Sequence, residues 1–140
     1  HEGEHVALDG VVRPAAFDIR HLLSLFGGVS LGAWDLSGKY TFASGRPYTP
    51  FDMGPSVAQN RGIFDLDRIN AVRSPDFHRI DLRVERRFSL GGSSLFVFAD
   101  VVNVTNRENA QQRIWNGKTR SGDWLDQFAL VPNIGMSLTF

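Results

Sequence analysis

Residues 77–90 read FHRIDLRVERRFSL, and their chemical character changes at every position. Side chains of a β-strand point alternately to its two faces, so this spacing predicts one long, two-faced strand. One face is mostly apolar and carries His78, Ile80, Leu82, Val84, Arg86, Phe88 and Leu90. The other face alternates in charge sign through Arg79, Asp81, Arg83, Glu85 and Arg87, so that neighbours partly neutralise each other. Ordinary strands have about five or six residues. A longer strand with these two faces is typical of a transmembrane barrel, which has lipid outside and a polar lumen inside.

Composition narrows the class of protein. The chain has 140 residues, the size of one domain, and its 42% hydrophobic content would support a modest core. Fifteen basic and fifteen acidic residues give a formal net charge of +0, so no nucleic-acid partner is expected. Cysteine is absent, which excludes disulfides and thiolate metal sites, and no cofactor is predicted.

Neither a membrane helix nor a signal peptide is indicated. No apolar run approaches the length of about 18 residues that a membrane helix needs. Residues 1–10 lack the basic and then apolar layout of a signal peptide. A place in a membrane would therefore require a barrel of strands.

Four other stretches carry a strand period: residues 18–29, 34–43, 95–104 and 133–140. The first two flank a short turn at Ser30 to Ala33, which predicts a hairpin. The predicted fold is all-β, an antiparallel meander of about five long strands in which each strand lies beside its sequence neighbour. The candidates for a lumen-facing surface are Asp35, Lys39, Arg79, Asp81, Arg83, Glu85, Arg87 and Asp100. The residues expected to share the opposite, lipid-facing surface include Leu36, Tyr40, Phe42, Ile80, Leu82, Val84, Met136 and Leu138.

Short and long connections alternate along the chain. Ser30 to Ala33 and Gly91 to Ser93 are short, whereas Gly45 to Pro75 and Asn106 to Val131 are long. The first long connection has no convincing strand period, and the second is polar apart from Ile114, Trp115, Trp124 and the Leu125 to Leu130 stretch. Bacterial outer-membrane barrels have short periplasmic turns and long outer loops, so this order predicts a periplasmic carboxy terminus. Five strands cannot close a barrel, for which about eight is the minimum. We therefore interpret the chain as the C-terminal part of a larger barrel whose other strands precede His1.

The first residues are predicted to form a region of their own. Residues 1–16 mix charge, Gly and Pro, which predicts an outer loop and the end of a strand at Val6 to Val12, ahead of the barrel strands of residues 17–140. HEGEH at residues 1–5 matches the H-E-x-x-H zinc pattern, which works where a helix places its two His one turn apart. No amphipathic helix follows it, so we interpret it as a loop and predict no metal site.

Several sequence blocks together resemble the TonB-dependent outer-membrane receptors, in particular the large receptors with an amino-terminal carboxypeptidase-regulatory-like domain. The resemblance covers residues 17–140 and rests on ordered blocks: FDIRHLLSL, ASGRPYTP at residues 43–50, RSPDFHRIDLRVERRF at 73–88, FADVVNVTNREN at 98–109 and PNIGMSLTF. HEGEH is outside this pattern.

The resemblance implies the last five strands of a plugged barrel of about 22 strands in the bacterial outer membrane. It implies active uptake of a ligand such as a siderophore, a vitamin or a glycan, with energy supplied through TonB, and no enzymatic activity. The implied partners are outer-membrane lipid, the chain's own upstream strands and plug domain, TonB through the missing N-terminal part, and the barrel-assembly machinery.

A few residues admit two interpretations. Ile134, Met136, Leu138 and Phe140 look like the C-terminal signal that the barrel-assembly machinery reads, and they also fit the lipid-facing side of a strand. Arg46 and Tyr48 are outer-loop candidates for ligand contact, although we favour a role of their segment in shaping the exit from strand to loop, since Pro47 and Pro50 end strand pairing. The charged row of residues 79–87 is either a solvated lumen wall or a surface on which the plug docks. Asn103-Val104-Thr105 matches a glycosylation sequon, which we discount because it falls within a predicted strand.

Two other classes of function remain open. The same strands would suit a passive porin or an adhesin-type barrel, and an upstream plug domain would exclude both. A soluble all-β binding module or a zinc hydrolase fragment built on HEGEH would instead cover its apolar faces with protein or bind zinc.

Overall fold

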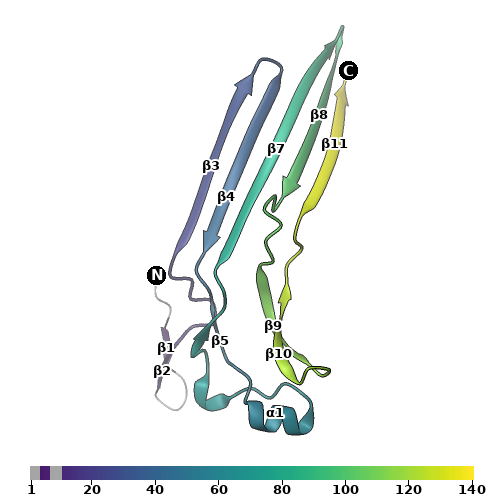
Figure 1. The fold of residues 1–140 in the computed structure, drawn as a ribbon. Helices are drawn as coiled ribbons and strands as arrows, with labels where there is room; N and C mark the ends of the chain where they lie inside the picture. The colour runs from purple at the N-terminus through teal and green to yellow at the C-terminus, as the bar shows by residue number, and fades with distance from the viewer. Residues whose placement is uncertain (1–3, 7–10) are drawn as a thin grey trace. The chain divides into compact units, whose positions relative to one another are not determined.

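The computed structural model describes residues 4–6 and 11–140, which lie mainly in antiparallel strands with one short α-helix (Figure 1). This confirms the predicted all-β class. Contacts divide the chain into two compact units. The sheet unit holds residues 23–42, 78–108 and 128–140, and the loop unit holds residues 43–77, 109–127 and the chain up to Leu22.

The sheet unit contains a five-stranded antiparallel sheet in the order β11-β8-β7-β4-β3. Figure 1 shows these strands side by side, in the order in which they follow one another along the chain. Their bounds are β3 Leu22–Leu31, β4 Trp34–Ala43, β7 Phe77–Leu90, β8 Ser93–Val102 and β11 Val131–Thr139. Five long strands, each beside its predicted neighbour, were expected from the alternation alone, and β7 has the predicted bounds.

The two predicted short turns are present. Gly32 and Ala33 join β3 to β4, and Gly91 and Gly92 join β7 to β8. Gly32 has φ +64° and Gly91 has φ +68°. Only a residue without a Cβ adopts this region without a steric penalty, so glycine at these positions fixes the turns and the register of the strands they join.

Three of the five strands begin and end at residues other than those predicted, and two of these shifts have a local cause. The first strand begins at Leu22 rather than Asp18, because Asp18 is buried in a contact with Arg73 in the loop unit. The fourth ends at Val102, because Asn103 turns the chain with φ +56°. The fifth begins two positions early, at Val131.

The loop unit contains more regular structure than the sequence indicated. Its elements are β1 Glu4–Val6, β2 Val12–Pro14, β5 Pro47–Tyr48, α1 Met53–Gln59, the 3-10 helix η1 Leu66–Arg68, β6 Val72–Arg73, β9 Ala110–Asn116 and β10 Ser121–Asp126. The prediction that the second long connection lacks strands was wrong, since β9 and β10 form an antiparallel hairpin. Polar side chains occupy both faces of this hairpin, so it carries no apolar period that a sequence reading could detect.

The segment that follows β8 is held by one buried amide. Asn103 is 1% exposed, and its Nδ2 donates to the backbone oxygens of Arg107 and Ala129 at 2.8 Å each. Asn106 adopts a similar left-handed conformation at φ 53°, but its Oδ1 only accepts from the Leu130 N–H, at 3.1 Å. The sequon at Asn103 thus lies after the strand, not within it, and its amide is already used inside the protein.

The same substitution is expected to destabilise the protein more at Asn103 than at Asn106. We expect Asn103→Asp to lower the free energy of unfolding by about 2 kcal/mol, because a buried carboxylate cannot donate to the backbone oxygens of Arg107 and Ala129. Asn106→Asp keeps its acceptor and its backbone conformation, so a change of at most about 0.5 kcal/mol is expected. Chemical denaturation of both variants beside the parent protein measures the difference. Equal losses would show that the Asn103 amide does not hold this segment.

Candidate functional site

The sheet has one continuous apolar face. The register pairs Val84 of β7 with Ala99 of β8, and Ala99 with Ile134 of β11. Because paired residues point to the same face, these three side chains lie on one side of the sheet. On the other side of β7, Tyr40 Oη lies 3.0 Å from His78 Nδ1, and a Cβ on Gly38 would lie 3.2 Å from Leu82 Cδ2. Strand β4 therefore presents its even-numbered residues to the same face. The predicted common surface is confirmed for Leu36, Tyr40, Phe42, Ile80, Leu82, Val84, Met136 and Leu138.

The described part of the chain does not cover this face. None of its Leu, Ile, Val, Met, Phe, Trp or Tyr side chains is buried. Ile134 is 83% exposed and Met136 is 79% exposed. These two belong, with Leu138, to the predicted assembly signal, and the fourth member, Phe140, is exposed beyond the end of β11. A contiguous exposed apolar surface of this kind marks a contact with lipid or with another protein.

The opposite face of the sheet carries a network of ion pairs. Arg79 Nε lies 3.0 Å from Asp81 Oδ2, and Arg83 Nε lies 2.9 Å from Glu85 Oε2. Arg83 also reaches across to Asp100 at 3.6 Å, and the Asn133 amide donates to Asp100 at 3.1 Å. The alternating charges therefore pair along β7 and across to β8, as their order in the sequence suggested.

The remaining candidates for the lumen-facing surface lie on this charged face as well. Lys39 lines a depression of about 220 Å³ together with Asp81, Arg83 and Asp100. Asp35 accepts a hydrogen bond from Ser30, and Arg87 is the register partner of Phe96. The structure brings the whole predicted set to one face of the sheet. That this face borders a lumen stays a prediction.

Arg86 is the exception on the apolar face. Its guanidinium carbon lies 4.8 Å from the ring centroid of Trp34 and 4.6 Å from that of Phe88. Both rings offer a π-face to the cation, which stabilises an arginine among apolar neighbours. All three residues lie near the short turns that end β3 and β7.

The loop unit explains why two separated sequence blocks occur together. Gly45, in the ASGRPYTP block, donates its N–H to Asp76 at 2.9 Å, and the Arg73 guanidinium donates to the Gly45 oxygen at 2.8 Å. Arg73 also donates to the backbone oxygen of Asp18 at 3.1 Å and forms an ion pair with its carboxylate. A Cβ on Gly45 would overlap the carbonyl of Ser74, so this close approach requires glycine. Asp18 and Gly45 are buried, and we call the set of Asp18, Gly45, Arg73, Ser74 and Asp76 the buried junction.

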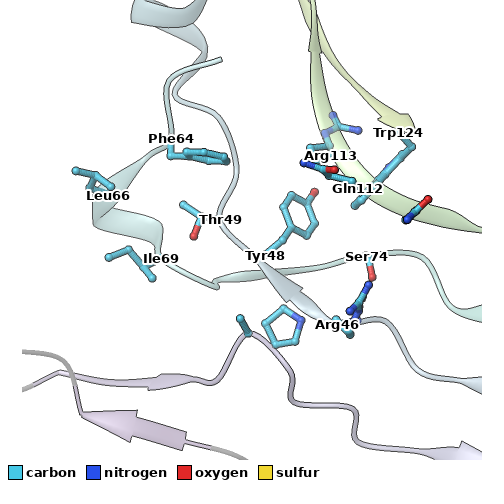
Figure 2. Close-up of a pocket in the computed structure, with 13 residues that line it drawn as sticks. Arg46, Tyr48, Thr49, Phe64, Leu66, Ile69, Ser74, Gln112, Arg113 and Trp124 are labelled. Carbon is cyan, nitrogen blue, oxygen red and sulfur yellow. Dashed lines mark hydrogen bonds between the residues drawn. The ribbon is translucent and has the colours of Figure 1, made fainter. Parts of the chain in front are cut away.

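A pocket of about 460 Å³ lies within the loop unit (Figure 2). Arg46 and Tyr48, the two outer-loop candidates, both line it. Their segment also shapes the chain path, since the backbone groups of Arg46 bond to Ser74. The expectation that Pro47 ends strand pairing was wrong, because Pro47 begins β5 and pairs with Arg73. Both interpretations of this segment therefore have a structural basis, and the pocket gives the ligand-contact interpretation a definite place.

Tyr48 divides the pocket into two ends. Figure 2 shows its ring between an apolar group on one side and the β9–β10 hairpin on the other. The apolar group is Phe64, Leu66 and Ile69, and the hairpin contributes Gln111, Gln112, Arg113 and Trp124. The Tyr48 and Trp124 rings meet edge to face with centroids 5.1 Å apart. Sequence reasoning missed the hairpin residues, although Ile114, Trp115, Trp124 and Leu125 interrupt an otherwise polar stretch there.

The structure offers no support for a metal centre or for membrane helices. Among residues 4–6 and 11–140, no group of three or more His, Asp or Glu side chains is arranged to hold a metal ion. In the same residues, no helix has both the length and the apolar character needed to cross a membrane. His1, Glu2 and Gly3 of HEGEH lie outside the described residues, while Glu4 and His5 belong to strand β1.

Comparison with protein-family models, curated proteins and solved structures found no match to this chain.

Proposed function

We propose that this chain is part of the wall of a bacterial outer-membrane β-barrel, and that the barrel belongs to a TonB-dependent receptor for active ligand uptake. The observation that carries the proposal is the sheet, which is exposed and apolar on one face and lined with paired charges on the other. Such a division suits a wall between lipid and an aqueous interior.

Strand length supports the membrane assignment. The five strands of the sheet have 10, 10, 14, 10 and 9 residues. A tilted transmembrane strand needs about 9 to 11 residues, and the average soluble strand has about five or six. Every strand of the sheet is therefore long enough to span a bilayer.

The edges of the sheet support a larger assembly. Within the described residues, β3 and β11 each pair on one side only. Unpaired strand edges cannot face hydrocarbon, because each unsatisfied backbone group there costs several kcal/mol. Five strands are also too few for closure, which takes about eight. Further strands of the full-length protein would complete the barrel.

The receptor assignment rests on the resemblance of the sequence blocks. In a receptor of this class the barrel provides the passage, a plug domain closes it, and TonB supplies the energy. The outer loops contribute selectivity for a siderophore, vitamin or glycan, and this chain contributes no catalytic group. The buried junction is consistent with the resemblance, because it gives a physical reason for the blocks ASGRPYTP and RSPD to occur together.

Two measurements on the full-length protein test the proposal in turn. After refolding in lipid vesicles, the protein is expected to migrate faster on a gel when unheated than when boiled, as a folded barrel does. Migration that does not depend on heating, together with a water-soluble monomer, would contradict the membrane assignment.

The second measurement separates a plugged receptor from a porin. The purified protein in a planar bilayer is expected to show no steady ion conductance, because a plug fills the lumen. Stable open-channel steps would overturn the receptor assignment in favour of a passive porin while leaving the barrel intact.

A further inference from the structure

The pocket of the loop unit combines an apolar end with a basic end. At the apolar end, Phe64 is 53% exposed and Leu66 is 71% exposed. Both side chains line the pocket, so a ligand placed there would remove apolar surface from water. Two large apolar side chains exposed within a concave site favour a ligand that has an apolar body.

The basic end comes from two arginines. Arg46 and Arg113 line the pocket, and among the residues that the structure describes no acidic one does. Arg113 lies over Trp124, its register partner on β10, with the guanidinium carbon 5.1 Å from the ring centroid. This cation–π contact holds the guanidinium beside the ring, while its N–H donors stay available for a ligand. The pocket thus offers positive charge without a carboxylate among its lining residues to neutralise it.

The two ends are bridged by groups that orient a ligand. Tyr48 stands between them, with its ring against Trp124. Gln111 and Gln112 add amide donors on the basic side. A site for a small molecule is usually an apolar cavity that contains a small number of polar groups.

We propose that this pocket binds an amphiphilic carboxylate, a ligand with an aromatic or aliphatic body and one anionic head. The apolar body would lie against Phe64 and Leu66, and the carboxylate would receive charge-assisted hydrogen bonds from Arg113 and Arg46. A neutral sugar fits less well, because one neighbour of the Trp124 ring is already a guanidinium and another is Tyr48. A cation is disfavoured by the two arginines.

A matched pair of probes tests the charge requirement. Biphenyl-4-carboxylate and biphenyl-4-methanol share one apolar body and differ in the anionic head. Titration calorimetry with the full-length protein in lipid nanodiscs is expected to show saturable binding of the acid at least tenfold tighter than binding of the alcohol. Equal affinities for the two probes, or no saturable binding of the acid, would overturn the proposal.

Variants then locate the site. Arg113→Gln is expected to weaken binding of the acid about tenfold or more while changing binding of the alcohol less than threefold. Retained binding of the alcohol shows that the variant still forms the pocket.

Lys118→Gln removes the same charge from the tip of the same hairpin, outside the pocket, and is expected to leave both affinities unchanged. Phe64→Ser should weaken both probes. If Lys118→Gln weakens the acid as much as Arg113→Gln does, the attraction is a general effect of charge and the pocket is not the site.

Because the pocket is proposed as a ligand site of the receptor, its role in uptake rests on the proposed function, whereas binding itself does not. A protein that folds as a barrel but binds neither probe keeps the proposed function and loses this ligand class. A protein that binds the acid but is water-soluble keeps the pocket and loses the receptor.

Discussion

Leu82→Arg is expected to impair folding of the full-length protein into bilayers far more than Arg83→Leu does. The two residues are neighbours near the middle of β7, Phe77–Leu90, and point to opposite faces of the sheet. If the face of Leu82 meets lipid, a new arginine there lies near the bilayer midplane and costs about 2 to 4 kcal/mol. Arg83→Leu removes contacts with Glu85 and Asp100 that are partly exposed to solvent, and such pairs contribute about 1 kcal/mol or less.

A membrane protein and a water-soluble protein are expected to show opposite orders of folding yield for these two variants. Refolding yield in lipid vesicles, read from heat-modifiable gel mobility, measures both variants under one condition, and Leu82→Met controls for replacement of the side chain by another apolar one. In a water-soluble protein the exposed Leu82 would tolerate arginine, and loss of the Arg83 ion pairs would be the larger effect. Equal yields, or a lower yield for Arg83→Leu, would therefore reject the lipid-facing assignment.

Asp18→Ala is expected to lower the free energy of unfolding of the loop unit by about 3 kcal/mol. This is the lower end of the range for breaking a buried ion pair. Its carboxylate is buried against the Arg73 guanidinium, which also donates to the oxygens of Asp18 and Gly45. Removing the carboxylate leaves a partly buried cation without its counter-charge. Since every 1.4 kcal/mol is a factor of ten, backbone amides of residues 43–77 should exchange hydrogen roughly 100-fold faster.

Hydrogen exchange followed by mass spectrometry localises this effect to peptides. Asp67→Ala is the control, because it removes the same charge from an exposed position in the same unit. Asp18→Asn keeps the shape and should give an intermediate rate. Exchange in residues 43–77 that is no faster in Asp18→Ala than in Asp67→Ala would show that the ion pair does not hold the junction.

Much of the sheet could be predicted because its signals are local. The alternation in residues 77–90 defines β7 without reference to any other part of the chain, and glycines at 32 and 91 mark the turns. With strand lengths and turn positions known, antiparallel pairing of sequence neighbours follows. The same alternation sorts side chains into an apolar and a charged face, so the shared surfaces of β4, β7 and β11 could be listed in advance.

The loop unit could not be predicted, because its contacts join residues far apart in sequence. Asp18 was assigned to a strand by its position in an alternating stretch, but Arg73, 55 positions later, draws it into the buried junction. The β9–β10 hairpin has no apolar period, so its existence and the position of Arg113 within the pocket were invisible from the sequence.

The sequence by itself determined the five strands of the sheet, their order and the character of each face, since period and turn chemistry act over a few neighbouring residues. Only the tertiary structure decided which distant side chains meet: Arg86 with Trp34, Arg73 with Asp18, and Arg113 with Trp124 beside Tyr48. Those meetings depend on the chain folding back on itself. Local sequence patterns do not encode these contacts, because the residues that form them are close in space and far apart along the chain.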